Sequence, residues 1–214
     1  MKQLRVLCLI VSVLAVSASA QAHFIWFLFD RQGTQVRLEL SESPGDSLVP
    51  MLGKLMPTMN SQFIGPMTED ADHKHLTTNL ISPEKAGGVS VVYGVFEGRW
   101  VRWSAKGSAN IAAAGQKLNL PVDITVRRTN SELVALVTRG GKPVAGAEFV
   151  AVLPGHKEPT PFKVSAQGEV RLPNIKEGIL ALRAVIHEPT SGEYKGLHYM
   201  EKLDCGTLTI KLSN

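Results

Sequence analysis

The chain has 214 residues, with 23 Lys and Arg against 19 Asp and Glu, and therefore a formal net charge of +4. It contains no polybasic or arginine-rich run, so nucleic acid is not an expected partner. One of its two cysteines, Cys8, lies in the N-terminal apolar run, so a processed chain would keep Cys205 alone and no intramolecular disulfide is expected.

Residues 1–22 have the three parts of a secretory signal peptide. Lys2 and Arg5 precede an apolar run over 6–16, and small residues follow it up to Ala22. The apolar run is far shorter than the roughly 20 residues that span a bilayer. We therefore predict an exported protein, periplasmic or secreted, with no membrane span after cleavage. Cleavage would remove two cations and no acid, which lowers the net charge to +2.

The position of the cut decides the chemistry of His23. Cleavage after Ala22 makes His23 the N-terminus, where its α-amine and imidazole can chelate one metal ion and a second histidine can complete a three-nitrogen site suited to Cu(II). Cleavage after Ala20 leaves Gln21-Ala22-His23, whose amine, two amides and imidazole form a square-planar site for Cu(II) or Ni(II). We favour the cut after Ala22. The alternative interpretation is that His23 stands beside the cleavage site by chance.

The first half of the mature chain shows short apolar runs typical of strands. We expect strands at 24–29, 34–40, 89–96 and 99–105, the last two joined by a turn at Glu97-Gly98, with Trp100 and Trp103 on opposite faces. Residues 41–88 are rich in Pro, Gly and Met, and they allow at most a short helix around 47–56.

The second half is more regular. Six strand candidates follow one another at short intervals, at 121–128, 132–140, 147–154, 162–173, 178–188 and 206–213. This rhythm is typical of an antiparallel sandwich. We therefore predict an all-β fold of two Ig/transthyretin-like antiparallel β-sandwich modules, one over 23–120 and one over 121–214.

The segments GGKPVAGAEFVAVLP, SAQGEVRLP and GILALRAVIHE resemble the transthyretin-like, carboxypeptidase-regulatory-like sandwich. Over about 23–212 the chain is similar to the periplasmic family of nickel/cobalt-transport accessory components. The residues that support this similarity are His23 with Trp26, PVDI, GKPVAGAEF, RAVIHE and the closing segment 199–208. The segment Phe27-Leu28-Phe29-Asp30, where the family pattern has a proline soon after the Trp, and a methionine-rich loop depart from that pattern. The resemblance implies nickel or cobalt uptake.

Several other side chains could contribute to a metal site. His187 ends one strand candidate and fits the family's pattern, so we rank it before His198 as the partner of His23. His73 and His75 would share one face of an extended segment and, with flanking carboxylates, suit Ni, Co, Cu or Zn, although a solvated polar loop explains them equally well.

Four methionines could bind Cu(I), but we favour gap-filling packing for them: Met51, Met56, Met59 and Met67. We expect Cys205 to be buried.

No nucleophile elbow, HExxH motif, phosphate-binding loop or dinucleotide-binding fingerprint occurs in the chain. We therefore predict a protein that is not an enzyme. It would bind a transition metal ion (nickel, cobalt or copper) and act in metal uptake, delivery or buffering, with a membrane metal transporter as the candidate partner. Two alternatives remain open: a copper oxidase or monooxygenase with an N-terminal histidine brace, and a secreted interaction module.

Overall fold

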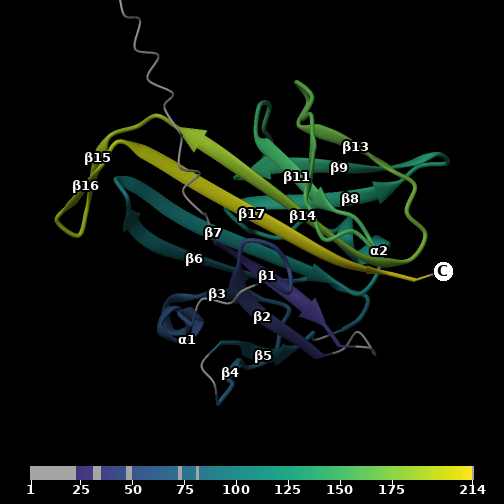
Figure 1. The fold of residues 1–214 in the computed structure, drawn as a ribbon, viewed down its shortest axis with the longest axis horizontal. Coiled ribbons are helices and arrows are strands. Elements are labelled where there is room, and N and C mark those ends of the chain that lie inside the picture. Colours follow the sequence, from purple (N-terminus) through teal and green to yellow (C-terminus); the bar gives the residue numbers. More distant parts are fainter. Residues whose placement is uncertain (1–22, 31–34, 47–49, 72–73, 81, 214) are drawn as a thin grey trace, which may run out of the picture.

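The computed structural model describes residues 23–30, 35–46, 50–71, 74–80 and 82–213. The predicted signal peptide over 1–22 and His73 lie outside these described residues. The described chain is all-β, as the sequence predicts, and its sheets form three stacked layers (Figure 1). We call them the first outer sheet, the central sheet and the second outer sheet.

The first outer sheet comes from the N-terminal part of the chain, and all its neighbours pair antiparallel. Its strands, in spatial order, are β1 (Phe24–Phe29), β2 (Gln35–Ser41), β5 (Leu76–Asn79) and β4 (Thr68–Glu69). The strand predicted at 24–29 is therefore confirmed; the one predicted at 34–40 appears as β2, which extends to Ser41, while residue 34 lies outside the described residues. The predicted short helix appears as α1 (Leu52–Leu55), which the 3₁₀ turn η1 (Met56–Thr58) continues.

The central sheet has seven strands from both halves of the chain. In spatial order they are β12 (Thr160–Phe162), β11 (Glu148–Val152), β14 (Gly178–Glu188), β17 (Glu201–Leu212), β7 (Arg99–Ser108), β6 (Gly87–Phe96) and β3 (Asn60–Gln62). The pairing of β7 with β17 is parallel, from Arg99 opposite Glu201 to Ser108 opposite Ile210. The other pairings in this sheet are antiparallel.

The second outer sheet contains β8 (Val122–Arg128), β9 (Glu132–Arg139), β10 (Lys142–Pro143) and β13 (Glu169–Pro173). The short helix α2 (Ile111–Ala114) precedes it, and a separate hairpin of β15 (Gly192–Tyr194) and β16 (Leu197–Tyr199) joins β14 to β17. The strand candidate over 162–173 contains a predicted turn over 165–168, which is confirmed and separates β12 from β13. Gly168 there has a φ of +77°, a conformation that glycine adopts without strain.

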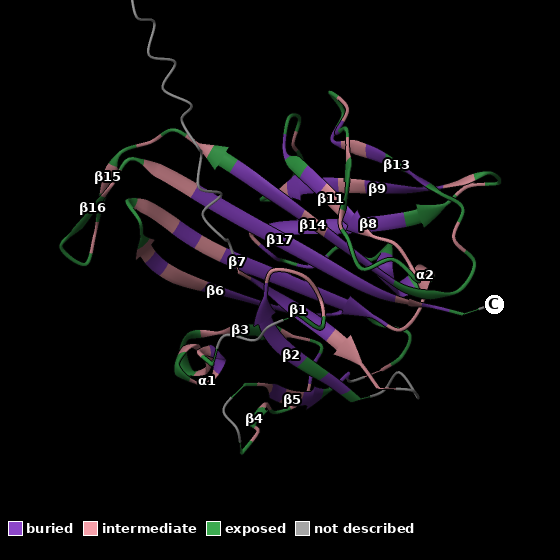
Figure 2. Ribbon diagram, in the orientation of Figure 1, coloured by how far each residue is buried: buried purple, intermediate pink, exposed green. Residues whose placement is uncertain are grey.

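The boundary predicted near residue 120 falls between β7 and β8. Each half supplies one outer sheet, yet both halves contribute strands to the central sheet. Two apolar cores result, one on each face of the central sheet, and Figure 2 shows the central strands buried along most of their length. Trp103 belongs to the core on the first outer sheet's side, and Trp100 on the same strand has the opposite side-chain direction, as expected for positions an odd number of residues apart.

Two glycines of the central sheet allow the layers to approach. A Cβ at Gly107 would lie 2.5 Å from the ring of Phe27 in β1, and one at Gly206 would lie 2.5 Å from Val122 in β8. Real Cβ atoms do not approach other atoms so closely. Each outer sheet therefore packs closely on the central sheet at a glycine, which has no side chain to keep the layers apart.

A buried ion pair joins the central sheet to the second outer sheet. The Nζ of Lys106 donates to Asp123 Oδ1 at 3.0 Å and to the carbonyl oxygens of Gln116 and Ile124. Leu118 N–H donates to the other carboxylate oxygen at 2.7 Å. Because burial disfavours charge, the pKa of Lys106 is lowered and that of Asp123 is raised. The contacts satisfy the ammonium group fully, which marks this pair as structural.

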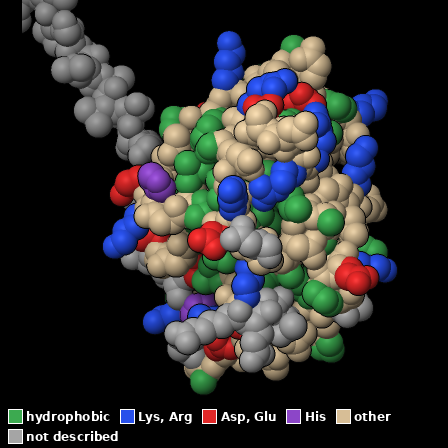
Figure 3. All heavy atoms as spheres, turned by 90° about the vertical axis from the view of Figure 1, so that its right-hand side faces the viewer, with side chains coloured by type: hydrophobic (Ala, Val, Ile, Leu, Met, Phe, Trp, Pro, Cys, Tyr) green, Lys and Arg blue, Asp and Glu red, His purple; other side chains and the backbone are tan. Residues whose placement is uncertain are grey.

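The face shown in Figure 3 has no single dominant sign of charge. In the view of Figure 3, basic, acidic and apolar side chains all appear on one end of the molecule. Within the described part of the chain, no helix has the length and apolar character needed to cross a bilayer.

Candidate functional site

His187 lies near the end of β14, where carboxylates from two neighbouring strands meet its ring. Its Nδ1 is 2.7 Å from Glu201 Oε1 in β17, and its Nε2 is 3.3 Å from Glu148 Oε1 in β11. The second oxygen of Glu201 is 3.1 Å from Arg99 Nε in β7. The side chain of His187 is 41% exposed, so a ligand can reach it from solvent.

This arrangement has the parts of a histidine metal ligand. A neutral imidazole that binds a metal through one nitrogen donates its other N–H, commonly to a carboxylate that fixes the ring and its tautomer. Glu201 is placed to accept that N–H from Nδ1. When a nitrogen and an oxygen each lie about 2.1 Å from one metal ion, they stand roughly 3.0–3.4 Å apart at ordinary bond angles. The 3.3 Å between His187 Nε2 and Glu148 fits that separation.

His23 precedes β1 directly and is half-buried. The next residue, Phe24, pairs with Ser41 and lies under the guanidinium of Arg183, which is 4.3 Å from the ring centroid. Arg183 and His187 are both on β14 and, being four residues apart, share one face of it. Val185 between them packs in the core beneath the first outer sheet. His23 and His187 therefore belong to the same side of the central sheet, and Arg183 is about 13 Å from His187 along the strand.

His75 lies in a different part of the first outer sheet. It directly precedes β5, and β5 and β1 lie on opposite sides of β2, so about 10 Å separates these two strands. Its Nδ1 is 3.4 Å from Asp70 Oδ2. The predicted pairing of His75 with His73 falls outside the described residues.

A buried carboxylate belongs to the same region. Glu39 is 1% exposed, and its Oε1 accepts hydrogen bonds from Ser41 Oγ and Gly45 N–H. Burial raises the pKa of Glu39, although these donors and the nearby His75 and Arg37 act in the opposite direction. The acid ties the loop that follows β2 to the sheet, which is a structural role.

The four candidate methionines (Met51, Met56, Met59 and Met67) are all partly buried against the core on the first outer sheet's side. This is the packing role that we favoured over Cu(I) binding. Cys205 is a free, buried thiol, as expected. Burial raises its pKa to about 12, so it is a thiol rather than a thiolate at neutral pH.

Among the described residues, no three His, Cys, Asp or Glu side chains converge as a preformed metal cluster. His187 and Glu148 supply two donors, so a site built on them needs further donors. Of the other described histidines, His156 lies in the exposed loop after β11, where it lines a groove, and His198 is 85% exposed and 3.9 Å from Glu193 in the hairpin.

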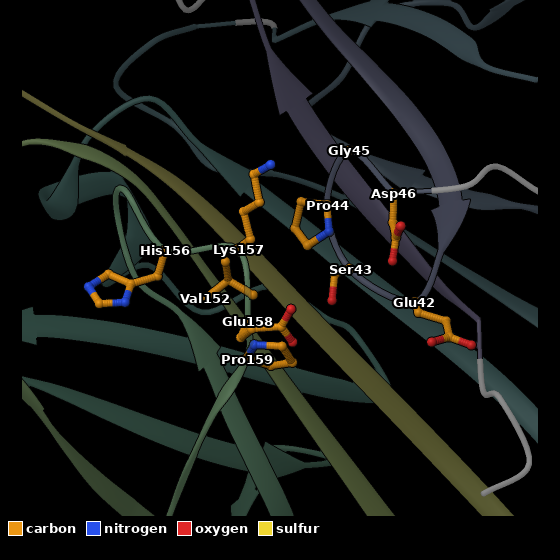
Figure 4. A pocket seen from close by; sticks show the side chains of 10 residues that line it. All are labelled: Glu42, Ser43, Pro44, Gly45, Asp46, Val152, His156, Lys157, Glu158 and Pro159. Carbon is orange, nitrogen blue, oxygen red and sulfur yellow. The ribbon is translucent and has the colours of Figure 1, made fainter.

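A groove of about 590 Å³ lies between the loop after β2 and the loop after β11 (Figure 4). Glu42, the first residue of the loop after β2, would pair with His23 if the β1–β2 register continued by one residue. Glu158 and Lys157 line the opposite wall. The groove therefore includes the position that the extended register would place opposite His23.

Three residues of this region were not among those predicted from the sequence: Glu148, Glu201 and Arg183. Glu148 and Glu201 stand 53 residues apart in the chain, and only the pairing of β11 and β17 with β14 brings them to one histidine. The available signal was the alternation in 178–188, which places Arg183 and His187 on one face of their strand.

No protein-family model matches this chain, and a comparison with curated proteins gives no match. The molecule is thus defined by its own architecture, an all-β protein of three stacked sheets that presents a carboxylate-flanked histidine at the end of a central strand.

Proposed function

We propose that this protein is exported and binds a transition metal ion, nickel, cobalt or copper, which it buffers or passes to a membrane transporter. The observation that carries the proposal is His187, whose ring nitrogens face Glu201 at 2.7 Å and Glu148 at 3.3 Å. His23 directly precedes β1, which lies on the same side of the central sheet. Cleavage after Ala22 would add the α-amine and imidazole of His23 to the donors at His187 and Glu148.

The donor set follows from simple coordination chemistry. An α-amine and the imidazole of the same residue form one chelate ring, so a single residue places two nitrogen ligands. A peptide amide in the same position is a poor ligand until it loses its proton. Nitrogen-rich sets of this kind suit Cu(II) and Ni(II). Protons compete for the same lone pairs, so affinity should fall as the pH is lowered.

Calorimetric titration with Cu(II) and Ni(II) tests the proposal on four proteins at one pH. They are mature protein that begins at His23, the same protein with a Gly-Ser extension, and the variants His23→Ala and His187→Ala. We expect the mature protein to bind at least about tenfold more tightly than each of the others. His198→Ala is the matched control and should bind like the mature protein. Equal affinities in all five proteins would contradict a site at the N-terminus and His187.

A further inference from the structure

We propose that Arg183 is a positioning residue, which clamps the start of the mature chain onto the central sheet and so holds His23 at the side that carries His187. This inference rests on the proposed function, because it concerns the same site. It does not make Arg183 a metal ligand, since a guanidinium is positively charged and has no free lone pair for a cation.

The clamp joins three strands. The Arg183 guanidinium stands 4.3 Å from the Phe24 ring centroid, within cation–π range. The same guanidinium donates to the carbonyl oxygen of Glu42 at 3.4 Å, a long hydrogen bond. One side chain of β14 thus holds both the first residue of β1 and the residue that follows β2.

The position of this contact matters because chain ends fray. The first residues of a domain are poorly ordered unless something ties them down. Two other polar contacts tie β1 to the central sheet, from Thr207 Oγ1 to the Ile25 carbonyl and from Lys211 Nζ to the Asp30 carbonyl. Of these three, the contact of Arg183 lies nearest the N-terminus, and it reaches the residue directly after His23. An N-terminal chelator with this anchor loses less freedom when it binds a metal.

The surroundings of Arg183 favour a fixed side chain. Val185 next to it is buried, and Arg183 itself is half-buried. The ring of Phe24 also meets Trp26 edge-on, with centroids 6.3 Å apart, and Trp26 Nε1 donates to the carbonyl oxygen of Ser41. The ring beneath the guanidinium is therefore itself held in place.

A metal-free experiment tests the clamp directly. Mature protein beginning at His23 is digested with an aminopeptidase, and the loss of N-terminal residues is followed by intact mass. Arg183→Met keeps an apolar chain of similar reach and removes the guanidinium. We expect it to be trimmed about tenfold faster than wild type, the factor that corresponds to one cation–π contact with a weak hydrogen bond. Lys211→Met is the matched control, since it removes a cation from the far end of β1, and it should be trimmed at the wild-type rate.

A second measurement tests the positioning of the metal ligand. We expect Arg183→Met to bind Cu(II) about tenfold more weakly. Its electron paramagnetic resonance spectrum should shift toward that of His187→Ala, because fewer nitrogen donors then reach the ion. Arg183→Lys, which keeps a cation but loses the planar fork, should be intermediate in both measurements.

The two measurements separate the inference from the proposed function. If the wild-type mature protein binds neither Cu(II) nor Ni(II), the proposed function fails, while the trimming rates still test the clamp. Equal trimming of Arg183→Met and wild type would overturn the clamp whatever the metal result. Faster trimming together with an unchanged affinity and spectrum would overturn the assignment of Arg183 as a positioning residue.

Discussion

At the scale of single residues, the candidate site depends on how one carboxylate is shared. Glu201 uses one oxygen for His187 Nδ1, at 2.7 Å, and the other for Arg99 Nε, at 3.1 Å. Arg99 thereby holds the carboxylate, and the carboxylate holds the imidazole. Nε2 of His187 is then directed toward Glu148. Orientation by such an outer contact is a common feature of metal-binding histidines.

This chain of contacts predicts an asymmetry between two variants. Glu201→Gln removes the carboxylate from His187 and should weaken Cu(II) or Ni(II) binding about tenfold to a hundredfold. Arg99→Gln breaks the same ion pair but leaves the carboxylate on the imidazole, so most of the affinity should remain. Isothermal titration of both variants makes the comparison. Equal losses of metal affinity in the two variants would show that the affinity depends on the ion pair between Glu201 and Arg99 rather than on the contact of Glu201 with His187.

Glu39 predicts a pH dependence of stability. Its folded-state pKa is raised above the ordinary 4.5, mainly by burial, so the folded protein binds a proton that the unfolded chain has released. The stabilisation from Glu39 is therefore fully present below about pH 4.5 and is lost as the pH rises through the folded-state pKa. Glu39→Gln keeps the acceptor oxygen and removes this titration.

Urea unfolding of wild type and Glu39→Gln at several pH values measures the effect. We expect the free energy of unfolding of wild type to fall relative to that of the variant as the pH rises above about 4.5, the ordinary pKa of a glutamate. The exposed loop residue Glu84 offers a control, Glu84→Gln, for the general loss of one acid. A constant difference between wild type and Glu39→Gln over this range would contradict the prediction.

At the scale of elements, the layers pack where the central strands lack side chains. Gly107 in β7 receives the ring of Phe27, and Gly206 in β17 receives Val122. The two glycines serve opposite faces of the same sheet, since the ring belongs to β1 and the valine to β8. A methyl group at either position would force apart two layers that meet in a close-packed core.

Gly107→Ala and Gly206→Ala should each lower the free energy of unfolding by about 1–3 kcal/mol, because the added Cβ would lie 2.5 Å from a buried side chain. Gly65→Ala is a matched control, since the nearest atom to its added Cβ would be 3.7 Å away. That variant should stay within about 0.5 kcal/mol of wild type or gain slightly. Chemical denaturation measures all three, and equal stabilities would contradict this account of the packing.

At the scale of the whole molecule, the two halves of the chain are interlocked. Strands β3, β6 and β7 from the first half and β11, β12, β14 and β17 from the second form one sheet. The parallel pairing of β7 with β17 makes the junction. Each half therefore has its own outer sheet and core, but neither half by itself contains all the strands of the central sheet.

This interlocking predicts that the halves do not fold apart. A fragment of residues 121–214 would expose the side of β14 and β17 that faces the first outer sheet, and residues 23–120 would lose the parallel neighbour of β7. We expect a single calorimetric unfolding transition for the mature chain. Each fragment alone should show poorly dispersed amide signals by nuclear magnetic resonance. Two resolved transitions, or a natively dispersed spectrum of either fragment, would contradict this prediction.

Most of the strands could be predicted from the sequence because alternation and apolar runs are local signals. The pairing of β7 with β17 could not, since a parallel neighbour about 100 residues away leaves no local trace. Likewise, His187 could be singled out at the end of its strand, whereas Glu148 and Glu201 reach it only through strand pairing. His187 could therefore be predicted as a candidate ligand from the sequence, whereas the contacts that orient its ring depend on the tertiary structure.

The place of β17 also constrains the order in which the chain can become native. This last strand occupies an interior position of the central sheet, between β14 and β7. As a chain emerges from its N-terminus onward, β7 must wait for about 100 further residues before its parallel neighbour arrives. Such long-range pairing slows folding and prolongs the exposure of unpaired strand edges. The central sheet therefore cannot be completed until its final strand, Glu201–Leu212, is available to pair.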